Sequence, residues 1–193
     1  NGPVRTLLLT LGFVSLFGMP YMVLMPIFAD QILHGGPEGL GILMGAAGVG
    51  ALAGALTLAM RRHLKGLSVW VASATSAFGI AIIAFAFSRS FWLSAALLVP
   101  TGFSMMLQMA GANTLVQAMV PDHLRGRVMA VYSMMFMGMA PLGALLAGSL
   151  ADRIGSPATV ALGGVVCIAA GAVFIRGLPR FRNEAREMIV SME

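Results

Sequence analysis

The sequence predicts an all-α membrane protein with six transmembrane helices, and its charged residues carry that prediction. Of the 193 residues, 59% are hydrophobic and only 10% are charged, against roughly 25% charged in an average soluble protein. The charged residues are also clustered, so that six long apolar stretches contain none of them. Because a helix needs roughly 20 apolar residues to cross a bilayer, each stretch is long enough for one span.

Each of the six stretches lies between two charged residues. In chain order, these pairs are Arg5 and Asp30, Glu38 and Arg61, Lys65 and Arg89, Arg89 and Asp122, Arg127 and Asp152, and Arg153 and Arg176. Helices are favoured over barrel strands, because the stretches are continuously apolar rather than alternating and lipid cannot satisfy an open strand edge. The expected spans are 6–28, 40–60, 67–87, 91–120, 128–151 and 158–175.

These spans predict one transmembrane domain over residues 1–178 and a basic tail over 179–193. An amphipathic helix on the membrane surface and a disordered segment are both open for the tail. Residues 121–127 are expected to form a loop, and Pro100 is a candidate kink in span four. The chain begins at Asn1, without methionine, which favours an internal or processed start.

Basic residues predict the orientation of the chain. Ten of the 12 Lys and Arg residues fall at the ends and loops on the side of the two termini, and only Arg89 and Arg153 fall on the other side. Cytoplasmic loops carry an excess of Lys and Arg. We therefore expect both termini to be cytoplasmic.

The distribution of helix-breaking residues indicates internal symmetry. Span one holds Gly18, Pro20 and Pro26, span four holds Pro100, and spans two and five are both rich in glycine. A three-span period of this kind is typical of transporters built from inverted repeats. The sequence therefore predicts two inverted three-helix repeats.

The predicted spans contain no charged side chain, which argues against several classes of function. The three histidines fall in loops without metal-ligand spacing, and the sequence has no phosphate-binding glycine loop or nucleophile–base pair. The basic residues lie in loops and a tail without interleaved aromatic residues, which argues against nucleic-acid binding. The single Cys167 excludes an intrachain disulfide. We expect no enzyme activity, no metal site and no cofactor.

Polar residues at membrane depth concentrate in span four. Thr101, Ser104 and Gln108 fall on one helical face, and Met105, Met109 and Asn113 form a neighbouring stripe. Amides are costly in lipid, so they should face other helices or water. A substrate-facing wall and interhelical hydrogen bonding are both open interpretations.

Methionine and aromatic residues supply further cavity candidates. The 16 methionines are frequent around residues 105–109 and 129–139. Flexible thioethers suit a surface that accepts varied apolar ligands, with ordinary packing as the alternative. In span one, Phe17 and Tyr21 are four residues apart and are candidate cavity residues, although an interfacial anchor is the alternative for Tyr21.

Span two carries two glycine pairs with four-residue spacing. They are Gly41 with Gly45, and Gly50 with Gly54. Such pairs let a neighbouring helix backbone approach closely. We expect them to mark helix packing.

Two stretches resemble the carboxy-terminal half of a major facilitator superfamily transporter, in the efflux branch that includes enterobactin exporters and macrolide-efflux proteins. They are Pro121-Asp-His-Leu-Arg-Gly-Arg-Val-Met-Ala-Val-Tyr132 and Gly138-Met-Ala-Pro-Leu-Gly-Ala-Leu-Leu-Ala-Gly-Ser-Leu-Ala-Asp-Arg-Ile-Gly155. The resemblance implies a half of a twelve-helix secondary transporter in a bacterial inner membrane. Spans one and four would line the cavity, spans two and five would form gates, and spans three and six would lie outside.

The resemblance also implies a function and partners. We expect export of small apolar or amphipathic molecules by alternating access, with proton antiport as one coupling scheme. The partners would be the lipid bilayer, a small-molecule substrate, and an amino-terminal six-helix half or a second copy of the chain. The alternative is a non-transporting, truncated membrane scaffold or assembly partner.

Three groups of residues match family motifs. Asp122, Arg125 and Arg127 lie in the first resembling stretch and are gating or loop candidates. Asp152 and Arg153 resemble part of a gating signature, but they end span five on the predicted outer side. A gating role, a local ion pair and a helix-end cap are therefore alternative interpretations of these two residues. The third group resembles a glycine-proline motif associated with antiporters and is expected to pack against other helices: Gly138, Pro141 and Gly143.

Overall fold

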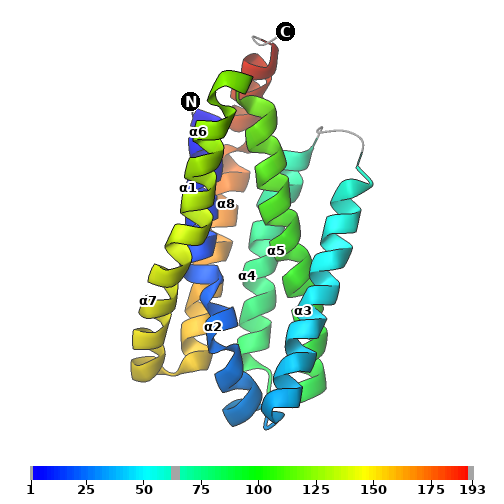
Figure 1. Ribbon diagram of the computed structural model, residues 1–193, viewed down its shortest axis with the longest axis vertical. Helices are drawn as coiled ribbons and strands as arrows, with labels where there is room; N and C mark the ends of the chain where they lie inside the picture. Colours follow the sequence, from blue (N-terminus) through cyan, green and yellow to red (C-terminus); the bar gives the residue numbers. More distant parts are fainter. Residues whose placement is uncertain (1, 62–65, 191–193) are drawn as a thin grey trace.

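The computed structural model describes the backbone of residues 2–61 and 66–190 and the side chains of residues 2–61 and 66–179. These residues form helices and short connections without strands. Six helical segments are long and apolar enough to cross a membrane, and they stand side by side with both termini at one end (Figure 1). His63 and the tail residues 191–193 lie outside the described part.

The first and fifth spans are each built from several helical pieces. The first comprises α1 (Gly2–Phe13), a π-helical segment η1 (Val14–Gly18), α2 (Pro20–Ile27) and a second π-helical segment η2 (Phe28–Ile32). The fifth comprises α6 (Asp122–Ser133), the π-helical segment η3 (Met134–Gly138) and α7 (Met139–Ile154). The remaining spans are α3 (Gly36–Ala59), α4 (Leu67–Phe87), α5 (Phe91–Met119) and α8 (Ser156–Val190).

The break in the first span follows from its glycine and proline. Pro20 has no backbone N–H, and it stands at the first turn of α2, where proline is tolerated. Before it, the Met19 N–H donates to the Val14 carbonyl at 3.0 Å, which closes the wider π turn. The break is visible as a change of direction between α1 and α2 (Figure 1).

Two local expectations differ from the structure. The candidate kink at Pro100 does not interrupt α5, which is one α-helix from Phe91 to Met119. The loop expected over residues 121–127 is wrong, because α6 begins at Asp122. Pro121 ends the connection, and its carbonyl accepts the N–H groups of Leu124 and Arg125 at 2.9 and 3.0 Å. An acidic residue in the first turn also suits the positive end of a helix dipole.

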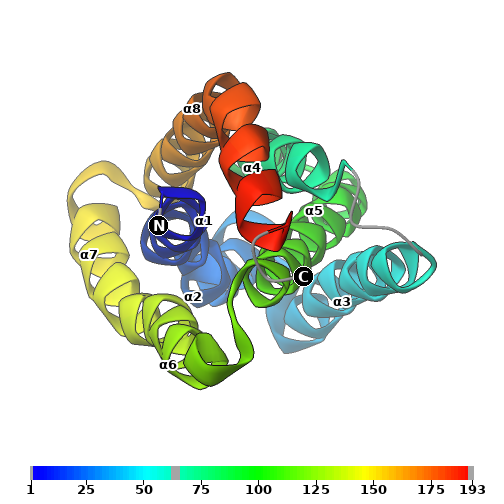
Figure 2. The ribbon, with the colours of Figure 1, turned by 90° about the horizontal axis from the view of Figure 1, so that it is seen from above.

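The tail is helical as far as the backbone is described. α8 continues through Pro179 to Val190, and its last turns cross over the end of the bundle (Figure 2). The backbone of residues 179–190 is therefore helical, and the position of this helix on the membrane surface stays a prediction.

Close backbone contacts join α3, α4, α5 and α8. α4 packs against α8 and α5, and α3 packs against α5. A Cβ added to Gly79 of α4 would lie 2.5 Å from the Gly164 carbonyl oxygen of α8. Cβ atoms added to Gly50 and Gly102 would likewise collide with the Val99 and Ala47 carbonyls across the α3–α5 contact. Small residues let these backbones touch.

The predicted packing glycines separate into two groups. Gly50, Gly54 and Gly143 each lie against the backbone of another helix, at Val99, Phe103 and Leu16 respectively. A Cβ added to Gly41 or Gly45 would meet no atom of another described helix within 4 Å, and one added to Gly138 would approach only Met134 at 3.7 Å. Pro141 is exposed. Gly41, Gly45 and Gly138 thus have no close contact with another described helix, and the packing role of Pro141 stays a prediction.

The second and fifth spans flank one open side of the bundle. In the most apolar part of each span, 17% of the residues of α3 and 11% of those of Asp122–Ile154 are buried. The corresponding share for the first span is 56%. Viewed along the bundle, α3 and α6–α7 stand apart, with α1, α2 and α5 between them (Figure 2). Their exposed side chains are largely apolar and include Leu52, Leu56, Leu145 and Leu146. Such a surface requires lipid or protein contact, so the chain is an integral membrane protein.

Candidate functional site

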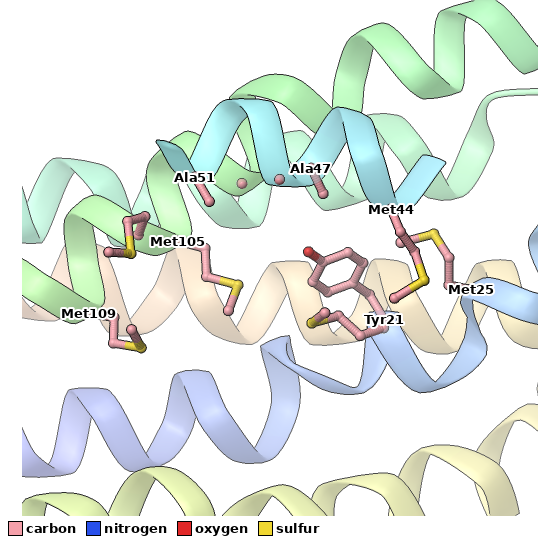
Figure 3. Close-up of a pocket in the computed structure, with 11 residues that line it drawn as sticks. Tyr21, Met25, Met44, Ala47, Ala51, Met105 and Met109 are labelled. Carbon is pink, nitrogen blue, oxygen red and sulfur yellow. The ribbon is translucent and has the colours of Figure 1, made fainter. Parts of the chain in front are cut away.

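A methionine-lined pocket lies where α2, α3 and α5 meet (Figure 3). Its volume is about 190 Å³. One tyrosine, six methionines and four small residues line it: Tyr21, Met22, Met25, Met44, Ala47, Gly48, Ala51, Gly102, Met105, Met106 and Met109. We call this site the methionine pocket.

Helical spacing and small residues create the pocket. On α5, Met105 and Met109 are one turn apart, and both line the space that Tyr21 also borders (Figure 3). On the opposite wall, Ala47 and Ala51 are also one turn apart on α3, and their short side chains leave space. The close contact of Gly102 with the Ala47 carbonyl draws α3 onto α5 beside this space. The pocket therefore has a tightly packed backbone edge and flexible thioether walls.

The chemistry of the methionine pocket is neutral and polarizable. Its described lining includes no charged side chain, and thioethers adapt to ligands of irregular shape. Among these lining residues, Tyr21 alone carries a hydroxyl group. Its ring meets the Phe78 ring edge-on, with centroids 5.9 Å apart. A mostly apolar pocket with few polar groups is typical of small-molecule binding sites.

Three of the predicted cavity residues meet in this pocket: Tyr21, Met105 and Met109. Thr101, Ser104 and Gln108 do not line it; they lie buried on the adjacent face of α5. The Thr101 hydroxyl donates to the Leu97 carbonyl of its own helix at 2.8 Å. The Gln108 Nε2 group is sealed inside the bundle and has no hydrogen-bond partner among the described residues.

The other two predicted cavity residues lie elsewhere. Asn113 is half-buried one turn beyond Met109, and its side-chain oxygen accepts a hydrogen bond from Gln117. Phe17 lines a second, smaller cavity of about 60 Å³ that α7 and α8 help to enclose. Tyr21 lines both cavities and separates them.

Four further methionines line the pocket and were not among the candidates predicted from the sequence: Met22, Met25, Met44 and Met106. A usable signal existed, because Met22 and Met25 are three residues apart and flank the helical face of Tyr21. Met44 precedes Ala47 by three residues on α3. These spacings place thioethers on the faces that border the pocket.

The gating candidates lie at the two ends of the bundle. Asp122, Arg125 and Arg127 are exposed in the first turns of α6, and Arg125 Nη2 lies 2.7 Å from Asp122 Oδ1. Asp152 and Arg153 are exposed at the end of α7, and neither forms an ion pair with a side chain that the structure describes. Gly155 ends this helix with φ +87°, a conformation that favours glycine.

Comparison with known protein families identifies the chain. Residues 3–192 match the model of the MFS_3 family, described as transmembrane secretion effector. The chain belongs to this family. The match covers nearly the whole chain, and it confirms both the resemblance to major facilitator transporters and the fold class of a six-helix half.

Several curated relatives support the same assignment. The chain is 32% identical over 147 residues to the multidrug efflux pump Tap of Mycolicibacterium fortuitum. It is also 32% identical over 150 residues to pumps of the same name from Mycobacterium bovis and Mycobacterium tuberculosis. These matches cover 76% to 78% of this chain but only 36% of each relative. The chain thus spans about a third of the length of the relatives it matches.

Proposed function

We propose that this member of the secretion effector family is one half of a secondary active exporter of small apolar or amphipathic molecules. In this proposal the methionine pocket is the share of the substrate site that this half supplies. The observation that carries the proposal is the neutral, thioether-lined pocket between α2, α3 and α5. The name of the relatives, multidrug efflux pump, supports export as the direction of transport.

The size of the pocket supports a site shared with a second half. Its volume of about 190 Å³ is below the roughly 300–1,000 Å³ of typical small-molecule sites. The sparsely buried helices α3 and α6–α7 would supply the contact surface for the partner. An amino-terminal six-helix half is the proposed partner, and a second copy of this chain is the alternative.

Alternating access would move this half against its partner. The proposed setting is a bacterial inner membrane with both termini in the cytoplasm, as the distribution of basic residues favours. Proton antiport remains part of the proposal. Since no acidic residue is among the described lining of the methionine pocket, the coupling acids would come from the partner half.

Flux measurements in proteoliposomes test the proposal. The chain is reconstituted with an amino-terminal six-helix half from a Tap relative, and extrusion of the neutral fluorescent probe Nile red is followed after a pH gradient is imposed. We expect gradient-dependent flux from the paired halves and none from either half alone. Absence of flux from both the pair and the homodimer, with both proteins folded and co-purifying, would contradict the transport proposal.

A non-transporting scaffold is the second candidate function. The exposed apolar faces of α3 and α7 suit the binding of a partner by a scaffold as well as by a transporter half. A scaffold would bind its partner without needing an open methionine pocket. Ala51→Phe fills the pocket, and co-purification checks that the variant still binds its partner. A transporter would then lose its flux, whereas a scaffold would keep its binding function unchanged. This single variant separates the two functions.

A further inference from the structure

The two tyrosines of the chain differ in how their hydroxyl groups are used. Tyr132 donates to the Met109 carbonyl at 2.7 Å. Tyr21 is only 2% exposed, yet its hydroxyl has no hydrogen-bond partner among the residues that the structure describes. The Tyr21 oxygen is not fully enclosed by protein atoms, unlike the Gln108 Nε2 group. The Tyr21 oxygen points into the methionine pocket, toward the space between Met105 and Ala47 (Figure 3).

The Tyr21 ring is held in this direction by its neighbours. Phe78 packs against it at 5.9 Å with an interplanar angle of 68°. Phe78 is in turn confined by Gly18, where an added Cβ would lie 2.6 Å from the Phe78 ring. An aromatic ring packed edge-on has little freedom to turn its hydroxyl elsewhere. The hydroxyl is thus preorganised toward the pocket rather than left there by loose packing.

The rest of the pocket lining cannot replace this hydroxyl as a hydrogen-bond donor. Methionine sulfur is a weak acceptor, and alanine and glycine side chains offer nothing. The backbone N–H groups of the lining residues lie within helices, where they bond to carbonyls of the same helix. A ligand in the pocket therefore meets one strong donor, the Tyr21 hydroxyl, whose oxygen can also accept one hydrogen bond, and several weak acceptors.

We propose that Tyr21 is a specificity-determining residue that donates a hydrogen bond to the ligand of the methionine pocket. The inference rests on the proposed function and names the class of substrate: polarizable, mainly apolar molecules that carry a neutral acceptor such as a carbonyl oxygen and few donors. Such an acceptor loses its water on entering an apolar site, and the Tyr21 hydroxyl replaces that water. Ligands rich in N–H or O–H groups would leave donors unsatisfied and would be disfavoured.

A matched pair of probes tests the inference. The probes are 2-acetylnaphthalene and 2-isopropenylnaphthalene, which have similar shapes but differ in having a carbonyl oxygen or a methylene group. Binding of each to the purified chain in detergent is measured by equilibrium dialysis. We expect the wild type to favour the ketone roughly fivefold, the effect of one neutral hydrogen bond. Tyr21→Phe should lower that ratio by about the same factor or more, because the carbonyl then loses its water without gaining a replacement donor.

Tyr132→Phe is the matched control, because it removes a hydroxyl that bonds to the backbone rather than facing the pocket. It should keep the ketone preference. Circular dichroism checks that both variants remain folded, and the infrared stretch of a ¹³C-labelled carbonyl gives a direct signature. That band should shift to lower frequency in the wild type and in Tyr132→Phe, but not in Tyr21→Phe.

The outcomes separate this inference from the function beneath it. If both probes bind, and the ratio of ketone to alkene binding is the same in the wild type and in Tyr21→Phe, the role of Tyr21 is overturned while the pocket remains a ligand site. If neither probe binds to the folded wild type or to its complex with the amino-terminal half, the methionine pocket is not a site for apolar ligands, and the proposed function fails with it.

Discussion

The Ser15 hydroxyl donates a hydrogen bond to the Phe136 carbonyl at 2.5 Å and joins the two π-helical segments at the middle of the first and fifth spans. Ser15 is fully buried. A π turn leaves a carbonyl without its usual α-helical partner, so an external donor is favourable there. The two irregular segments, 121 residues apart in the chain, therefore stabilise each other.

Replacing Ser15 with alanine should weaken the bundle at this contact. A hydrogen bond between membrane helices contributes roughly 0.6 kcal/mol on average, so we expect a loss of about that size in the free energy of unfolding. Titration with sodium dodecyl sulfate, followed by circular dichroism, measures it. Ser149→Ala is the control, because that hydroxyl is exposed and bonds within α7. Equal stability of the two variants would show that the contact contributes nothing.

Two glycines of α3 should respond oppositely to the same substitution. A Cβ at Gly50 would collide with the Val99 carbonyl, whereas a Cβ at Gly45 meets nothing within 4 Å. Gly50→Ala should separate α3 from α5 and lower the thermal transition of the detergent-purified chain. Gly45→Ala should leave the transition unchanged or raise it, since alanine is the better helix former by about 1 kcal/mol. A larger loss for Gly45→Ala would contradict the observed packing of α3.

Filling the methionine pocket should remove ligand binding without unfolding the chain. Ala51 lines the pocket, and its neighbour Leu52 is 62% exposed on the outside of α3. We expect Ala51→Phe to weaken Nile red binding by about tenfold or more, as measured by fluorescence titration, because the added ring occupies the ligand's space. Leu52→Phe introduces the same ring on the outer face and should bind as the wild type does. Equal binding by both variants would place the ligand elsewhere.

The ion pair between Asp122 and Arg125 should contribute little to stability. Asp122 is 88% exposed, and pairs at the surface are worth roughly 0–1 kcal/mol. Asp122→Asn should therefore change the free energy of unfolding by less than about 0.5 kcal/mol in the same detergent titration. A loss above about 1 kcal/mol would mean that this pair has a structural role beyond its exposed contact.

The number and type of the spans could be predicted from the sequence because both follow from charge-free length. Lipid excludes charges over a fixed thickness, so spacing alone locates six helices. The residues at which each span begins and ends were harder to predict. Residues 121–127 are polar and look like a loop, yet Pro121 and Asp122 form a helix start, which extends the fifth span by several residues.

The candidate site could be predicted only in part, because helical faces are set by local irregularities. Phe17 and Tyr21 have the spacing of one helical face, but the π turn at Val14–Gly18 and the break at Met19 rotate one relative to the other. Both residues line the smaller cavity, but only Tyr21 also reaches the methionine pocket. Likewise, both glycine pairs of α3 have the same spacing, and only the position of α5 decides that Gly50 and Gly54 are the packed pair.

Photolabelling of the methionine pocket tests the central claim most directly. A diazirine derivative of 2-acetylnaphthalene is photolysed with the purified chain, and the labelled peptides are identified by mass spectrometry with and without excess 2-acetylnaphthalene. We predict competable labelling on the pocket segments, residues 21–25 and 105–109, and its loss in Ala51→Phe. Labelling confined to the exposed leucines of α3 and α7, or labelling that excess ligand does not reduce, would contradict the assignment of this pocket as the substrate site.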